Sequence, residues 1–130
     1  MTGPGLPTDR QVNAWLAAGE GRLGVDLEYC WAWLDVPEGC LLAKTRCWAP
    51  APDGEPYFCT VCLFRAPMAQ IGERDQRETV LHELAHVADF AARPWQQSDP
   101  HGPAWGAIMS RLGLDASGEH ILRAAAMGPA

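Results

Sequence analysis

Residues 76–92 contain neither glycine nor proline, and the pentapeptide H-E-L-A-H lies inside this run at residues 82–86. The run has a broad apolar surface, which predicts a long helix that the rest of the fold must bury. Residues four apart lie on one helix face, so His82 and His86 can bind one cation. Glu83 lies about 100° around the helix from His82, where its carboxylate can reach a water beside that cation. Two ordinary, partly buried histidines are the alternative, but chance produces this pentapeptide on the order of once in a hundred such chains.

Signals at both ends limit this predicted helix. Asp75 and Glu78 have the D-x-x-E spacing of a capping box, which predicts that the helix begins at Gln76. Pro94 disfavours helical backbone angles at Arg93 and so predicts where the helix ends. The residues that would bury the helix are apolar: Val80, Leu81, Leu84, Ala85, Val87, Ala88 and Ala91.

The pentapeptide supplies only part of a zinc site, because catalytic zinc usually takes three protein ligands and leaves a fourth position for water. His101 is the leading candidate for the third ligand. It directly precedes Gly102 and Pro103, which predict the start of another helix, and Gly113 predicts the end of that helix. An apolar stripe would pack this helix on the core and hold His101 in place: Trp105, Ile108, Met109 and Leu112.

Two segments of the chain resemble the SprT/Spartan-like metalloprotease domain. They are E-T-V-L-H-E-L-A-H at residues 78–86 and H-G-P-A-W at residues 101–105, the latter followed by I-M-S-R-L-G. Members of that family carry an H-E-x-x-H helix and a downstream H-G-P-x-[FW] segment whose histidine completes the zinc site. The close match covers residues 76–113. Many members append a zinc ribbon or a DNA-binding tail, and this sequence contains neither.

The resemblance implies a zinc metallopeptidase with one zinc ion per chain. His82, His86 and His101 would be the metal ligands. Glu83 would be the catalytic base, which takes a proton from water and passes it to the leaving amine. The nominal donors to the oxyanion are Tyr29, Tyr57 and His120, and none of them is favoured.

The N-terminal half of the chain predicts one helix followed by three strands. Thr8 and Gln11 have the T-x-x-Q spacing of a capping box, and Gly19 and Gly21 predict the end of this helix. After this helix, alternating polarity predicts the first strand, and segments bounded by turn residues predict the other two. The predicted strands cover residues 25–34, 40–48 and 57–65.

We therefore expect an α+β fold with a zincin-like arrangement. It consists of an N-terminal helix, a small, mostly antiparallel sheet of three strands, the H-E-x-x-H active-site helix and C-terminal helices. Residues 1–7 are expected to form a flexible tail, and residues 8–127 a single SprT-like metalloprotease domain of common size. Ser117 would cap a last helix over residues 118–127.

The resemblance implies a protein or peptide substrate, and composition argues against two other kinds of partner. The net charge is −6, and Lys44 is the only lysine, so we expect weak or no direct binding to nucleic acid. Recruitment to DNA would then require a partner protein. No apolar run reaches membrane-spanning length and the N-terminus lacks a signal-peptide pattern, so we expect no membrane association. The five cysteines then predict reduced thiols in the cytoplasm.

Two alternative functions remain open. The same zinc site could be structural, in a non-catalytic binding module, and a closed fourth coordination position would identify that case. The segment E-G-C-L at residues 38–41 also looks like that of peptide deformylases, which use the cysteine as third ligand. Cys40 would then replace His101, although residue 42 is leucine rather than serine and the rest of that signature is missing.

Four other residues with metal-binding or acid-base chemistry have less specific interpretations. Cys59 and Cys62 have C-x-x-C spacing, but strand residues three apart point to opposite faces, so we interpret them as buried strand thiols. His120 is interpreted as a surface residue. Asp89 lies on the helix face of His82, and is either hydrogen-bonded to a ligand imidazole or a solvated carboxylate.

Overall fold

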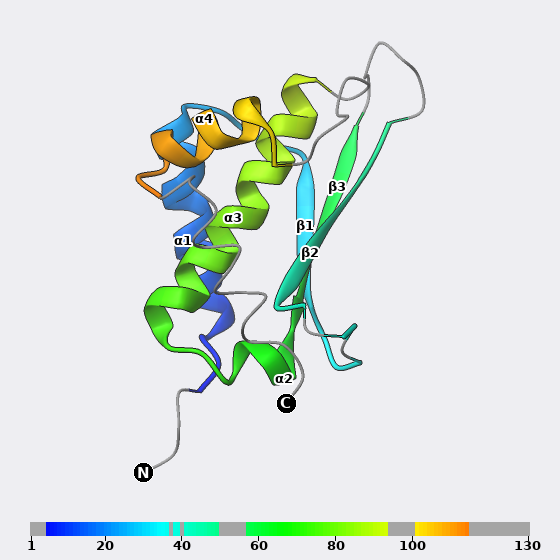
Figure 1. Cartoon of the computed structure of the whole chain (residues 1–130), viewed down its shortest axis with the longest axis vertical. Coiled ribbons are helices and arrows are strands. Elements are labelled where there is room, and N and C mark those ends of the chain that lie inside the picture. Colours follow the sequence, from blue (N-terminus) through cyan, green and yellow to red (C-terminus); the bar gives the residue numbers. More distant parts are fainter. Residues whose placement is uncertain (1–4, 37, 40, 50–56, 94–100, 115–130) are drawn as a thin grey trace.

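The computed structural model describes residues 5–36, 38–39, 41–49, 57–93 and 101–114. The elements follow in the order α1 (Asp9–Leu23), β1 (Tyr29–Leu34), β2 (Ala43–Trp48), β3 (Phe58–Phe64), α2 (Arg65–Met68), α3 (Glu73–Ala92) and α4 (Pro103–Arg111). Figure 1 shows α1, α3 and α4 on one side of the sheet, with α3 in contact with β2 and β3. The predicted α+β class is confirmed.

The sheet is mixed, which corrects the expectation of a mostly antiparallel sheet. The strand order is β1-β3-β2, with β1 parallel to β3 and β2 antiparallel to β3. Strands that follow each other in sequence usually lie side by side, but here β3 separates β1 from β2. The physical reason is the different burial of the three strands. β3 is buried along most of its length, as a central strand requires, whereas β1 and β2 contain exposed residues and form the edges.

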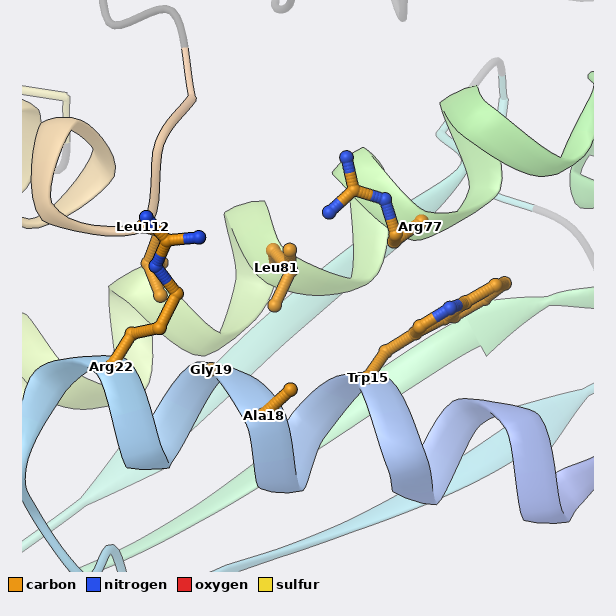
Figure 2. Close-up of a pocket in the computed structure, with 7 residues that line it drawn as sticks. All are labelled: Trp15, Ala18, Gly19, Arg22, Arg77, Leu81 and Leu112. Atoms are coloured by element: carbon orange, nitrogen blue, oxygen red, sulfur yellow. The ribbon is translucent and has the colours of Figure 1, made fainter.

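Helix α1 continues through both glycines that were predicted to end it. The cap at its start is confirmed, because the Thr8 hydroxyl accepts a hydrogen bond from the Gln11 amide at 3.1 Å. Its end is at Gly24, whose φ of 70° is left-handed. Gly19 is instead a packing residue: a Cβ there would lie 2.6 Å from a methyl carbon of Leu84. Figure 2 shows Gly19 on α1 facing α3.

Helix α3 begins earlier than the sequence predicted. Its first residue is Glu73, and Gly72 is the N-cap without a side-chain hydrogen bond, so the predicted capping box is wrong. Asp75 lies in the first turn, where a negative charge is favourable. The Glu78 carboxylate is bonded to the guanidinium of Arg74, one turn earlier, at 3.0 Å. The predicted end is confirmed by Arg93 as the C-cap.

The core lies between α1, the inner face of the sheet, α3 and α4. The predicted apolar stripe of α4 is confirmed: Trp105, Met109 and Leu112 are buried, and Ile108 is partly buried against the core. Gly113 follows the helix with a φ of 78°, as its predicted role as the helix end requires. The short helix α2 was not predicted.

Several predictions fall on residues outside the described ranges. These are residues 1–4 of the expected tail, the position of Cys40, and the last helix with Ser117 and His120. Within the tail, the Gly5 carbonyl accepts a hydrogen bond from the Gln76 side chain at 2.7 Å. None of the helices in the described ranges is both long enough and apolar enough to cross a membrane.

Candidate metal centre

Three imidazole rings meet at the side of α3 that faces the start of α4. His82 and His86 lie one turn apart on α3, and His101 directly precedes Gly102, the N-cap of α4. The Nε2 atoms of His82 and His86 are 3.2 Å apart, as are those of His86 and His101. The Nε2 atoms of His82 and His101 are 3.4 Å apart. These three histidines can hold a metal ion together.

The donor set fits a zinc ion in both spacing and chemistry. At Zn–N distances of about 2.0–2.1 Å, two ligands of a tetrahedral ion lie about 3.3–3.4 Å apart, close to the observed separations. Hydrogen bonds alone do not account for this triangle. Each inward-facing nitrogen carries either a hydrogen or a lone pair, so at least one of the three pairs must consist of like groups. A cation removes this conflict, because it accepts all three lone pairs.

The three histidines differ in their exposure to solvent. His82 is 9% exposed, His86 is half-buried and His101 is exposed, so the cluster opens to solvent on the side of His101. Burial, together with the neighbouring His101, lowers the pKa of His86 to about 4. His86 is therefore neutral near pH 7, as a metal-ligating imidazole must be.

Trp105 of α4 packs against all three imidazoles. Its ring centroid lies 4.9 Å from that of His82 and 4.8 Å from that of His101. The His86 ring stacks on it at 5.5 Å with an angle of 20° between the planes. Trp105 is only 2% exposed, so it fixes the rings from the core side. The sequence identified Trp105 as a core residue, and its contact with the histidines was missed.

Glu83 directs a buried carboxyl group toward the histidine cluster. The residue is 6% exposed, and its Oε2 lies 3.9 Å from the Nε2 of His82. Its Oε1 accepts a hydrogen bond of 2.7 Å from the Thr45 hydroxyl. Burial raises the pKa of Glu83 to about 7, although the Thr45 hydrogen bond acts in the opposite direction. A carboxyl group with such a pKa can both accept and release a proton near neutral pH.

Thr45 was not identified from the sequence, and it comes from a different element than Glu83. It lies on β2, opposite Val61 of β3. Residues two apart in a strand share a face, so the signal that could have found it is the alternation of β2. That alternation puts Cys47 on the same face as Thr45, and Cys47 pairs with Cys59.

The cysteines of β3 are buried strand thiols, as the sequence predicted. Cys59 and Cys62 both lie within β3 and are 0% and 6% exposed. Neither forms a disulfide. The hydrogen bond with Cys59 and burial both raise the pKa of the Cys47 thiol, so Cys47 is protonated at neutral pH.

The sequence also suggested Asp89, Tyr29 and Tyr57 as residues of the site. Asp89 is 1% exposed, and its Oδ1 accepts a hydrogen bond of 2.7 Å from Arg93, so the expectation of a solvated carboxylate is wrong. The Tyr29 hydroxyl donates to Glu20 at 3.3 Å. The Tyr57 hydroxyl accepts from the amide of Glu28 at 3.0 Å. Both tyrosine hydroxyls are therefore engaged by groups other than the histidines.

A separate groove lies between α1 and α3, beside the end of α4 (Figure 2). Two arginines, Arg22 and Arg77, extend from the two helices on either side of Leu81. The groove is lined by Trp15, Ala18, Gly19, Arg22, Arg77, Leu81 and Leu112. The residues that line the groove include neither Glu83 nor any of the three histidines, so the groove is distinct from the candidate metal centre.

Comparison with known protein families gives one match. The model of the SprT-like family matches residues 42–121, which is more than half of the chain. The matched region includes β2, β3, α3 and α4, and therefore Thr45, Glu83 and the three histidines. No curated protein matches the chain.

Proposed function

Because the chain belongs to the SprT-like family, we propose that it is a zinc metallopeptidase that hydrolyses peptide bonds. One zinc ion would be held by His82, His86 and His101, and Glu83 would be the catalytic base. The observation that carries this proposal is the triangle of Nε2 atoms, 3.2–3.4 Å apart, with the buried carboxyl group of Glu83 beside it.

The chain's own groups have distinct tasks in this mechanism. When bound, zinc supplies a Lewis acid that polarises the scissile carbonyl and makes water more acidic. Glu83 takes a proton from the attacking water at Oε2 and returns it to the leaving nitrogen. The Trp105 ring packs against all three imidazoles and keeps them in place. Because His101 is exposed, a substrate would approach the site from its side.

The position of β2 supports a peptide as the substrate. Among the described residues, β2 pairs with β3 on one side only, so its other edge has unpaired backbone groups. An extended peptide can add to such an edge through main-chain hydrogen bonds. Thr45 of β2 contacts Glu83, so a peptide bound along β2 would pass close to the catalytic base.

A structural zinc site in a non-catalytic module is the second candidate. The burial of Glu83 argues against it, because a purely structural site has no need for an ionisable carboxyl group beside the ligands. Burying such a group costs free energy unless it is paired. Among the described residues, no lysine or arginine forms an ion pair with Glu83.

The free thiols of Cys30, Cys47, Cys59 and Cys62 support a cytoplasmic setting.

Replacement of Glu83 by glutamine tests the proposal. We expect Glu83→Gln to keep about one zinc per chain, since the side chain is not a ligand, and to lose hydrolysis of fluorescein-labelled casein about 10²–10⁴-fold. Metal analysis and the fluorescence assay on the same preparations measure both quantities. Glu73→Gln, an exposed change on the same helix, is the control and should remain active.

The contrary outcome is also specific. A wild-type protein that is inert on every unfolded substrate, with zinc bound by four protein atoms, would establish the structural function instead.

A further inference from the structure

We propose that Thr45 is a positioning residue that holds the carboxyl group of Glu83 in its catalytic orientation. This inference rests on the proposed function, because it assigns a role within the same site. The Thr45 hydroxyl is bonded to the carboxyl group of Glu83, so its effect would be exerted through that residue.

The contact between Thr45 and Glu83 fixes one end of the carboxyl group. The Thr45 hydroxyl lies 2.7 Å from Oε1 of Glu83 and 3.3 Å from the main-chain carbonyl oxygen of the same residue. A hydroxyl group has one hydrogen to donate, and the shorter contact has the better length for an O–H···O bond. With Oε1 held in this way, Oε2 is the oxygen that faces the Nε2 of His82 at 3.9 Å.

A buried carboxyl group needs such a partner to remain in one orientation. Glu83 is 6% exposed, and its side chain has several rotatable bonds. Without a donor, Oε1 would be a buried acceptor with no partner, which is unfavourable, so the carboxyl group would turn toward another donor or toward water. Rotation would move Oε2 away from the position from which it can accept a proton from the attacking water.

Threonine at position 45 suits this role because of the strand that carries it. Its branched β-carbon restricts χ1 and favours an extended backbone, so the hydroxyl is presented in a defined direction. Alternation along β2 turns Lys44 and Arg46 to the opposite face. Thr45 therefore connects the base to the edge strand along which a peptide would bind, and fixes the base relative to the substrate.

Three variants of the zinc-loaded protein test the proposal. Thr45→Val should lower kcat about 10- to 100-fold, the range expected for the loss of a hydrogen bond to a charged group, while KM and zinc content stay unchanged. Thr45→Ser keeps the hydroxyl and should restore most of kcat. Thr60→Val is the matched control: Thr60 lies on the neighbouring strand, where its hydroxyl contacts the thiol of Cys30 at 3.8 Å, and the variant should behave as wild type.

A crystal structure of Thr45→Val, with or without zinc, provides a readout other than activity. The expected result is a Glu83 carboxyl group rotated away from its position in the wild type. Full kcat in Thr45→Val, a Thr45→Ser variant as slow as Thr45→Val, or loss of zinc together with activity would overturn the inference. If the wild type hydrolyses nothing, the proposed function fails, and an unmoved Glu83 in the crystal structure would separately overturn the role of Thr45.

Discussion

At the scale of single residues, the identity of the third ligand can be tested directly. We expect His101→Ala to lose most of its zinc on dialysis, because only two of the three imidazoles remain. Cys40→Ala should keep about one zinc per chain, because the proposed site uses no thiolate. Metal analysis of both purified variants measures the outcome. An empty site in Cys40→Ala and a full one in His101→Ala would favour the deformylase-like alternative.

The residues of the centre differ in how far the sequence could predict them. His82, Glu83 and His86 lie within five consecutive residues, and helical geometry alone relates them. The predicted start of a helix directly after His101 made it the leading candidate for the third ligand, and the resemblance of this segment to a known family supported that assignment. The alternation of β2 could assign Thr45 to one face of its strand, but it could not predict the bond to Glu83, because that bond joins a strand and a helix that are distant in sequence. Such a contact depends on which strand packs against α3.

At the scale of elements, the tight packing of α1 against α3 predicts different outcomes for two glycines in the same helix. Gly21→Ala should stabilise the protein by about 0.5–1 kcal/mol, because nothing lies near the added methyl group and alanine favours helix. In Gly19→Ala the methyl group would meet Leu84 at 2.6 Å and Leu81 at 2.9 Å. Overpacking of about 1–3 kcal/mol should offset or reverse the gain.

Chemical denaturation of both glycine variants and the wild type measures these differences. A Gly19→Ala variant as stable as Gly21→Ala would show that the interface between α1 and α3 is looser than the structure indicates. Both substitutions have the same effect on helix propensity, so the difference between the two variants measures the packing alone.

The elements were easier to predict than their arrangement. Each of the three strands was predicted within a few residues of its observed position. The signals were alternating polarity in the first strand and turn residues at the ends of the other two. The strand order β1-β3-β2 was not predicted, because strand pairing depends on which strand is buried on both faces. Gly19 was misread for a related reason: a glycine that permits close packing looks the same in sequence as one that ends a helix.

At the scale of the whole molecule, charge predicts weak interaction with DNA. With a net charge of −6 and dispersed arginines, the chain has few clustered cations to neutralise phosphates, so we expect a Kd at or above about 10⁻⁴ M. DNA should also not be required for hydrolysis. Fluorescence anisotropy with single-stranded and duplex oligonucleotides near 0.15 M salt measures the affinity. A micromolar or tighter Kd would refute the expectation and make recruitment by a partner protein unnecessary.

The central position of β3 has a consequence for the order in which the protein assembles during synthesis. β1 and β2 leave the ribosome first, but each pairs only with β3 in the described sheet, and β3 is translated last of the three. A nascent chain that stops before residue 58 therefore contains two unpaired strands and cannot form the native sheet. Until β3 emerges, these two edges are open to pairing with other chains, which makes this the interval in which a chaperone would matter most.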